Sequence, residues 1–465
     1  MANFFKENTK KKVNKRVNET NTITIDKLDL NGCGVGRYRK KPIFVTGSLP
    51  NEEVDIRITE QKNKYILAKL LKVNKPNDHR ISPKCQHFSL CGGCDLQHLD
   101  YAEQLSFKRK KVTELFSRSG ISIELINQFP WQKSIKSSQW HYRRKARVGV
   151  QFDKNAQAII GFRQKATNQL VAIKSCPVLV EPANNIFPIL KSLLAKLTVK
   201  KAIGHIEVIS ADDIANKAST LILVVRQIRP INAHDSQLWQ EYADKYAWTV
   251  KFLESKLNEE NSDEMSGKLS QKLSHGDLNY RLTDDIDIHF SSTDFIQINQ
   301  SVNLAMIEQA LAWLTLEPND HVLDLFCGLG NFSLPIAKKV AKVVGVEGVQ
   351  TMVDKALNNA QINEIDNCQF YQADLSSQWL STDWAKNNFT KVLLDPARAG
   401  AEQAVEQVAQ LNIPTILYVS CEPTTLARDS QILLENGYKV IKIGLIDMFS
   451  QTKHVETMVL FQQSK

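Results

Sequence analysis

The last part of the sequence, residues 291–465, repeats one pattern that few folds can accommodate. Short apolar runs that end in an acidic or small residue alternate with stretches of helical periodicity. A buried strand followed by a crossover helix is the unit of a parallel sheet, so the pattern predicts an α/β domain with a doubly wound, Rossmann-like sheet. The closing segment is expected to add a hairpin at the sheet edge. The five predicted parallel strands are His321–Leu325, Lys342–Glu347, Gln369–Asp374, Lys391–Asp395 and Thr415–Ser420.

A glycine loop follows the first of these strands and reads Asp324-Leu-Phe-Cys-Gly-Leu-Gly-Asn331. In doubly wound sheets a ligand lies beyond the strand ends, where glycine lets it approach the backbone. The next strand ends at Glu347, whose carboxylate can accept both hydroxyls of a ribose, and Asp374 closes the third strand, where it can hold an adenine amino group. A dinucleotide would need G-x-G-x-x-G, and Asp324 would repel its pyrophosphate. A ligand with an ammonium and a sulfonium fits better, which predicts S-adenosylmethionine as the cofactor.

Cys421 and Glu456 are the predicted catalytic pair. Cys421 follows the fifth strand and Glu456 begins the final one, so both are expected at the edge of the sheet where the cofactor binds. A thiolate that adds to carbon 6 of a uracil makes carbon 5 nucleophilic, and a carboxylate can then remove the carbon 5 proton. An ordinary thiol is only a few per cent ionised at pH 7, so Arg398 is a possible source of thiolate stabilisation. Asp395 ends the fourth strand and can bind substrate. Taken alone, Cys421 could instead be an ordinary cysteine buried in the core.

Two further blocks precede this domain. Residues 15–75 contain short β-rich runs around a glycine-rich turn, which predicts an OB-like β-barrel of the TRAM kind. Residues 1–14 form a basic arm that is expected to be disordered. Residues 76–290 are expected to form a central α+β domain, in which residues 255–276 are polar and low in complexity, as in a mobile surface insertion.

Residues 131–147 combine six Lys or Arg side chains and three aromatic ones with no acidic residue. Basic groups neutralise phosphates and aromatic rings stack on unpaired bases, so this mixture favours RNA binding. A solvated basic face is the alternative. The net charge of +9 is too modest to decide between the two.

Eight cysteines occur in a chain without a recognisable export signal, and we therefore expect a cytoplasmic protein whose cysteines serve metal binding or catalysis. Cys85, Cys91 and Cys94 lie close together in the sequence, and Cys176 precedes a proline. Four thiolates fit either tetrahedral zinc or a 4Fe–4S cluster. The spacing predicts a metal site in the central domain and leaves both metals open.

Four motifs resemble the successive signatures of the RNA uracil-5 methyltransferases. They are Phe295–Asn299, Lys391–Gly400, Ser420–Leu426 and His454–Glu456. With the barrel and the cysteine segment in front, the resemblance covers nearly the whole chain. It implies Cys421 as nucleophile, Glu456 as base and a 4Fe–4S cluster in the central iron–sulfur domain, on Cys85, Cys91, Cys94 and Cys176. It also implies cofactor or substrate contacts at Gln297, Phe326, Asn331, Glu347, Asp374 and Asp395.

The resemblance further implies structured 23S ribosomal RNA as the partner, with no membrane contact and a monomeric enzyme. A transfer RNA branch of the family lacks the barrel and the cysteine segment, and a second ribosomal branch lacks the barrel. A non-catalytic RNA-binding module would be expected to lose Cys421 or Glu456. An amino-group methyltransferase would carry Asp/Asn-Pro-Pro-Tyr where this chain has Asp395–Arg398. Glu422 departs from the usual asparagine, and its charge is expected to raise the pKa of the adjacent thiol.

Overall fold

The computed structural model describes residues 18–213, 218–254 and 278–464. The chain divides into two compact units. The first contains the residues up to Ser89, together with Cys94–Gln104 and Gln451–Lys453; the second contains Leu90–Gly93, Leu105–Ser450 and His454–Lys465. The predicted basic arm and the predicted insertion at residues 255–276 lie outside the described residues.

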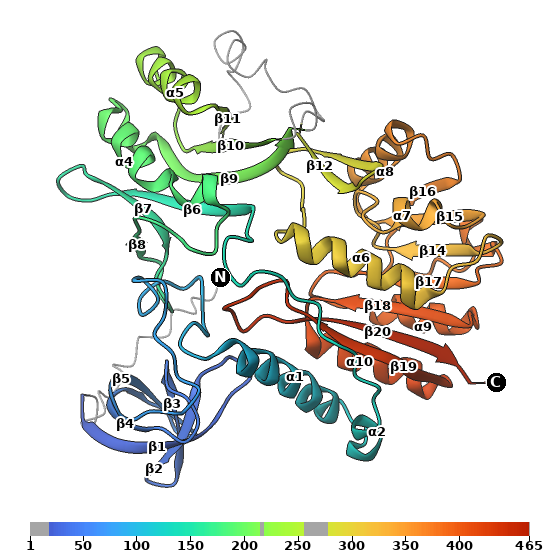
Figure 1. Cartoon of the computed structure of the whole chain (residues 1–465), viewed down its shortest axis with the longest axis horizontal. Helices are drawn as coiled ribbons and strands as arrows, with labels where there is room; N and C mark the ends of the chain where they lie inside the picture. The colour runs from blue at the N-terminus through green and yellow to red at the C-terminus, as the bar shows by residue number, and fades with distance from the viewer. Residues whose placement is uncertain (1–17, 214–217, 255–277, 465) are drawn as a thin grey trace, which may run out of the picture. The chain divides into compact units, whose positions relative to one another are not determined.

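The first unit contains a small closed β-barrel with the strand order β1-β2-β3-β5-β4 (Figure 1). Alternating side chains such as Ile23, Ile25 and Ile43 fill its core. Gly36 lies within β2, where a Cβ atom would come within 2.3 Å of the Thr24 carbonyl oxygen, so only glycine allows the two strands to approach this closely. The predicted barrel is confirmed, and its strands are β1 (Thr20–Leu28), β2 (Gly34–Tyr38), β3 (Lys41–Thr46), β4 (Glu53–Gln61) and β5 (Ile66–Lys75).

A six-stranded sheet with the order β11-β10-β9-β6-β7-β8 occupies the middle of the chain. Its core includes Leu190 from α4 and Trp239 from α5, and these two helices contact β7 and β11. The elements of this region are α1 (Tyr101–Arg118), α2 (Ile123–Asn127), β6 (Lys145–Phe152), β7 (Ala158–Arg163), β8 (Leu170–Ala172), α3 (Glu181–Asn184), α4 (Ile186–Lys196), η1 (Lys200–Ala202), β9 (Ile203–Asp213), β10 (Ala218–Gln227), α5 (Ala233–Tyr246) and β11 (Trp248–Glu254).

The second unit also contains a two-stranded sheet of β12 and β13 and a seven-stranded sheet with the order β16-β15-β14-β17-β18-β20-β19 (Figure 1). The first five strands are parallel, and β20 pairs antiparallel with both β18 and β19. The elements are β12 (Leu278–Thr283), β13 (Ile286–Phe290), α6 (Gln300–Leu314), β14 (His321–Leu325), α7 (Ser333–Ala337), β15 (Lys342–Glu347), α8 (Gln350–Ile362), β16 (Cys368–Gln372), η3 (Trp384–Lys386), β17 (Lys391–Leu394), α9 (Glu402–Gln410), β18 (Thr415–Ser420), α10 (Pro423–Glu435), β19 (Tyr438–Ile446) and β20 (Glu456–Gln463).

The central strands β14, β17 and β18 are buried along almost their whole length. This is the expected state of a parallel sheet whose two faces are both covered, and it explains why these strands read as continuous apolar runs rather than alternating ones. The prediction of a doubly wound sheet is confirmed. Among the described residues, no helix is long and apolar enough to cross a membrane.

The predicted iron–sulfur domain is wrong. No group of three or more His, Cys, Asp or Glu side chains in the described ranges is arranged to hold a metal ion. Cys85 and Cys94 belong to the first unit, whereas Cys91 and Cys176 belong to the second, so neither unit by itself supplies more than two of the four thiols. The described residues therefore provide no ligand set for the predicted cluster.

Candidate active site

Functional side chains line the end of the seven-stranded sheet at which its parallel strands have their carboxyl termini. Four neighbouring parallel strands, β15, β14, β17 and β18, have their carboxyl ends at this end, while β20 runs in the opposite direction and begins there. The sheet order therefore places one residue from each strand in a row. From β15 to β20 the row is Glu347, Phe326, Asp395, Cys421 and Glu456.

Cys421 and Glu456 lie next to each other because of the pairing of β18 with β20. The last pair in the ladder joins Ser420 to Thr457, so the next residue on each strand is the cysteine and the glutamate. The Glu456 side chain is only 5% exposed, and its Oε2 atom accepts no hydrogen bond from the described residues. Burial, together with the nearby Asp395, raises the pKa of the Glu456 carboxyl to about 8. The structure thus brings the two predicted catalytic residues together.

The Cys421 thiol lies in an environment that favours its neutral form. Burial raises its pKa to about 11, and the negative charges of Glu456 and Asp395 act in the same direction. Arg398 lowers the pKa, as the sequence suggested, but its effect is smaller than theirs. Glu422 instead caps the N-terminus of α10, where its side chain accepts a hydrogen bond from the Thr424 backbone N–H at 3.2 Å. Glu456 and Asp395, which are distant from Cys421 in sequence, are therefore the acids that raise the pKa of its thiol.

Asp395 occupies the middle of the row, between the cofactor loop and the nucleophile. Its backbone N–H donates to the Leu325 carbonyl at 3.3 Å, which extends the pairing of β17 with β14 by one residue. Burial raises the pKa of the Asp395 carboxyl to about 7. From this position the Asp395 side chain can contact either a cofactor or a substrate uracil.

The loop after β14 has an unusual backbone. Phe326 has a φ of 65°, in the left-handed region that residues with a side chain rarely occupy, and Gly328 and Gly330 also have positive φ values. Hydrogen bonds from the Phe326 and Cys327 N–H groups to the Val346 carbonyl hold this conformation. Backbone strain of this kind clusters at ligand sites, and here it lies directly after the carboxyl end of β14.

Two carboxylates flank the loop. Glu347 accepts hydrogen bonds from the backbone N–H groups of Gly328 at 3.2 Å and Gly348 at 2.8 Å, which fixes its carboxylate beside the loop. Asp324 is 1% exposed; Ser333 donates to its Oδ2 at 2.5 Å, but its Oδ1 has no hydrogen-bond donor among the described residues. Burial raises the pKa of Asp324 to about 7. An orphaned, buried carboxylate oxygen is a site for a cationic ligand, so these residues fit the expected sulfonium cofactor.

The remaining predicted contacts differ in their surroundings. The Asn331 side chain exchanges two hydrogen bonds with the side chain of Asn303, at 2.9 and 3.1 Å. Gln297 is half-buried and uses its backbone carbonyl to accept from Arg144. Asp374 is exposed on the loop after β16, where its carboxylate accepts from the backbone and hydroxyl of Ser376.

Comparison with known proteins identifies the family. A family model for tRNA (uracil-5-)-methyltransferases matches residues 100–464, and a TRAM domain model matches residues 14–71. The 23S rRNA (uracil(1939)-C(5))-methyltransferase RlmD of Colwellia psychrerythraea is 59% identical over 99% of both chains. The protein of the same name from Psychromonas ingrahamii is 43% identical over 99% of this chain and 100% of its own.

The chain belongs to the uracil-5 RNA methyltransferase family. It is a transferase of one-carbon groups and uses S-adenosylmethionine, in agreement with the glycine loop. A solved structure of the tRNA (uracil-54, C5)-methyltransferase of Pyrococcus abyssi, in complex with S-adenosyl-L-homocysteine, has a TM-score of 0.69 with this chain at 24% identity. It covers 94% of this chain and 99% of its own, and shows that the fold is shared.

The basic–aromatic run of this family member is only partly exposed. Arg144 is 4% exposed; its guanidinium lies 4.2 Å from the centre of the Tyr280 ring, and its Nε donates to the Gln297 carbonyl. Lys145 donates to the carbonyls of Ser292 and Asp294. These two cations therefore tie the segment to the motif before α6, and only others such as Lys133 and Lys136 face solvent.

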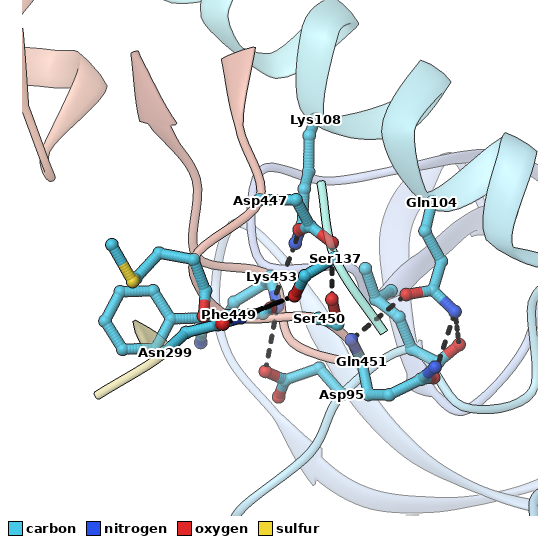
Figure 2. A network of polar contacts seen from close by, with 12 residues as sticks. Asp95, Gln104, Lys108, Ser137, Asn299, Asp447, Phe449, Ser450, Gln451 and Lys453 are labelled. Atoms are coloured by element: carbon cyan, nitrogen blue, oxygen red, sulfur yellow. Dashed lines mark hydrogen bonds and ion pairs between the residues drawn. The ribbon is translucent and has the colours of Figure 1, made fainter. Parts of the chain in front are cut away.

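Sequence reasoning missed two charged residues near the base. Lys108 on α1 and Asp447, directly after β19, are both 1% exposed and form an ion pair of 2.5 Å (Figure 2). Lys108 stands in a run of four basic residues, 108–111, that looks like the solvated face of a helix. Only burial distinguishes it from its neighbours, so the sequence carried no signal for its role.

The reactivity of Cys421 tests the electrostatics of this edge. Without ligands at pH 8, a pKa of about 11 leaves roughly one thiol in a thousand ionised, so alkylation by iodoacetamide should be slow. Glu456→Gln removes a negative charge and should accelerate alkylation, while Arg398→Ala should slow it. Peptide mass spectrometry of a time course measures each rate. Cys33 is an internal control, because burial also raises its pKa to about 11 and its rate should not respond. Equal rates at Cys421 in all three proteins would contradict the assignment.

Proposed function

We propose that this protein forms 5-methyluridine at position 1939 of 23S ribosomal RNA. The full-length similarity to the two RlmD proteins supports this substrate. The observation that carries the chemistry is the adjacency of Cys421 and Glu456 across the β18–β20 ladder. A nucleophile and a base on facing strand ends suit a reaction in which one group adds to the ring and the other removes a proton.

In the proposed reaction the Cys421 thiolate adds to carbon 6 of the uracil, which shifts electron density to carbon 5. S-adenosylmethionine, when bound, supplies the methyl group that carbon 5 takes up. Glu456 then removes the carbon 5 proton, and the thiolate leaves carbon 6 by elimination. The uracil has to leave its base stack to reach Cys421, which costs a few kcal/mol that RNA binding must offset.

Asp324 and Glu347 are the residues best suited to hold the cofactor. The unpartnered Oδ1 of Asp324 can accept from an ammonium group, and the Glu347 carboxylate can accept from ribose hydroxyls. We assign Gln297, Phe326, Asn331, Asp374 and Asp395 to further cofactor or substrate contacts. The order of the strands places the loop after β14 on one side of Asp395 and Cys421 on the other. This order supports a cofactor site at the loop and a substrate site at Cys421.

The raised pKa values determine the protonation states of Cys421 and Glu456 before the substrate binds. With a pKa of about 11, Cys421 is protonated, and with a pKa of about 8, Glu456 is mostly protonated at pH 7. A positive charge near Cys421 favours the thiolate, so a bound sulfonium and Arg398 act in the same direction. Proton removal by Glu456 requires its ionised form, and this step should therefore accelerate as the pH rises towards about 8.

The substrate is tested by mapping 5-methyluridine in ribosomal and transfer RNA from cells that lack this protein. We expect the modification at position 1939 of 23S RNA to disappear and transfer RNA to be unaffected. A gene that encodes the intact chain should restore it, whereas Cys421→Ala should not. Persistence at position 1939, or loss from transfer RNA, would contradict the proposed substrate.

The two catalytic replacements should fail at different steps. Cys421→Ala cannot activate carbon 5, so it should form no covalent adduct with RNA. Glu456→Gln can still add the thiolate and transfer methyl but removes the carbon 5 proton poorly, so it should accumulate a denaturant-resistant adduct that carries the methyl group. The unmutated enzyme should form a similar adduct with RNA that contains 5-fluorouridine, because fluorine cannot leave as a cation. Gel mobility and mass spectrometry detect these species, and attachment at another cysteine would refute the mechanism.

Cofactor binding should depend on the ionisation of Asp324. Its pKa of about 7 in the free protein means that acid below pH 7 protonates the carboxyl and removes the partner of the ammonium group. The affinity for S-adenosylmethionine should therefore fall about tenfold per unit below pH 7, as long as this group alone titrates. Calorimetric titrations between pH 5.5 and 7.5 measure the effect. Asp324→Asn should bind weakly with little dependence on pH; an equally steep dependence in this variant would assign the effect to another group.

A further inference from the structure

A buried ion pair, Lys108 with Asp447, acts on the pKa of Glu456, the predicted base. The Lys108 ammonium on α1 contacts Asp447 Oδ1 at 2.5 Å and also donates to the Phe449 carbonyl at 3.1 Å (Figure 2). Both charged side chains are 1% exposed. The pair belongs entirely to the second unit and connects α1 with the segment that joins β19 to β20.

Asp447 also organises the segment between these strands. Its Oδ2 accepts from the Ser450 hydroxyl at 2.6 Å, and the Ser450 carbonyl accepts from the Tyr142 hydroxyl at 2.8 Å. The Asp447 backbone N–H donates to the Ile135 carbonyl at 2.9 Å. Helix α1 and the 131–147 segment thus hold the backbone that directly follows β19.

The β19–β20 pairing places Asp447 next in sequence to the cross-strand partner of Glu456. Ile446, the last residue of β19, pairs with Glu456, so Asp447 follows directly after the partner of the base. We propose that Lys108 and Asp447 are positioning residues for Glu456: the ion pair fixes the end of β19, whose last residue pairs with Glu456, and sets the charge around the Glu456 carboxylate. This inference rests on the proposed function, in which Glu456 is the base.

The chemistry of the pair supports a role beyond packing. A buried ion pair contributes little net stability compared with apolar side chains of similar volume, because both charges lose their hydration. Its charges, however, act on every nearby titratable group. Lys108 lowers the pKa of Glu456 and Asp447 raises it, so the two charges oppose each other at the base. The other titratable groups around Glu456 are Asp395 after β17, Cys421 after β18 and His454, which packs on Phe449.

The test measures how fast the methylated adduct resolves at different pH values, in single turnovers with a 23S RNA fragment. For the unmutated enzyme we expect a midpoint near pH 8. Lys108→Met should raise the midpoint, because the ammonium that lowers the pKa of Glu456 is lost. Each unit of this rise should slow resolution at pH 7 about tenfold. Asp447→Asn should lower the midpoint. Lys108→Arg keeps the charge and should restore a value near that of the unmutated enzyme.

Lys391→Met provides the matched control. Lys391 forms a similar, largely buried ion pair of 2.7 Å with Asp320, at the opposite edge of the same sheet. This variant should lose thermal stability but keep the midpoint near pH 8, and S-adenosylmethionine affinity should be unchanged in the Lys108 and Asp447 variants. Shifts in opposite directions for Lys108→Met and Asp447→Asn support the inference, since general structural damage would not produce them.

Two outcomes overturn the inference, and they have different meanings. If the unmutated enzyme forms its adduct but both variants keep its midpoint or shift it in the same direction, the inference fails and the proposed function stands. If the unmutated enzyme forms no adduct even with 5-fluorouridine RNA, the proposed function fails and the inference with it. The isosteric Asp447→Asn variant keeps the test decisive if Lys108→Met does not fold.

Discussion

The hydrogen-bond ladder between β18 and β20 determines where the chemistry of this protein can occur. All five parallel strands deliver their carboxyl ends to one edge of the sheet, but the final strand contributes to that edge only because it runs in the opposite direction. Its register with β18 makes Cys421 and Glu456 neighbours. A shift of the ladder by one residue would turn the Glu456 side chain to the other face of the sheet and separate the pair.

The same end of the sheet gathers several buried carboxyl groups. Asp324, Asp395 and Glu456 all have raised pKa values, and burial is the largest cause in each case. Such groups bind protons at rest and attract a cation when one is available. In the proposed reaction the sulfonium cofactor meets this demand and also favours the Cys421 thiolate. Cofactor binding and nucleophile activation would then share one electrostatic origin.

Sequence reasoning could not supply the distances and directions between segments. Cys85, Cys91 and Cys94 are close in sequence, yet the described residues contain no group of three or more possible metal ligands. Arg144 belongs to a basic run that suggested an RNA-binding face, yet its guanidinium is buried against Tyr280. In both cases the residue types were read correctly, but the packing of distant segments decided their surroundings.

The sequence by itself determined the elements whose causes are local. Apolar runs, glycine positions and helical periodicity specified the parallel strands, the loop after β14 and the small barrel, because these features depend on residues within a few positions of one another. The motifs also identified Cys421 and Glu456 as candidates. Only the tertiary structure decided that these two would meet, that Lys108 would be buried beside Asp447, and which acids would oppose the thiol. Strand register, burial and electrostatic fields arise between segments that are distant in the chain, and no local pattern encodes them.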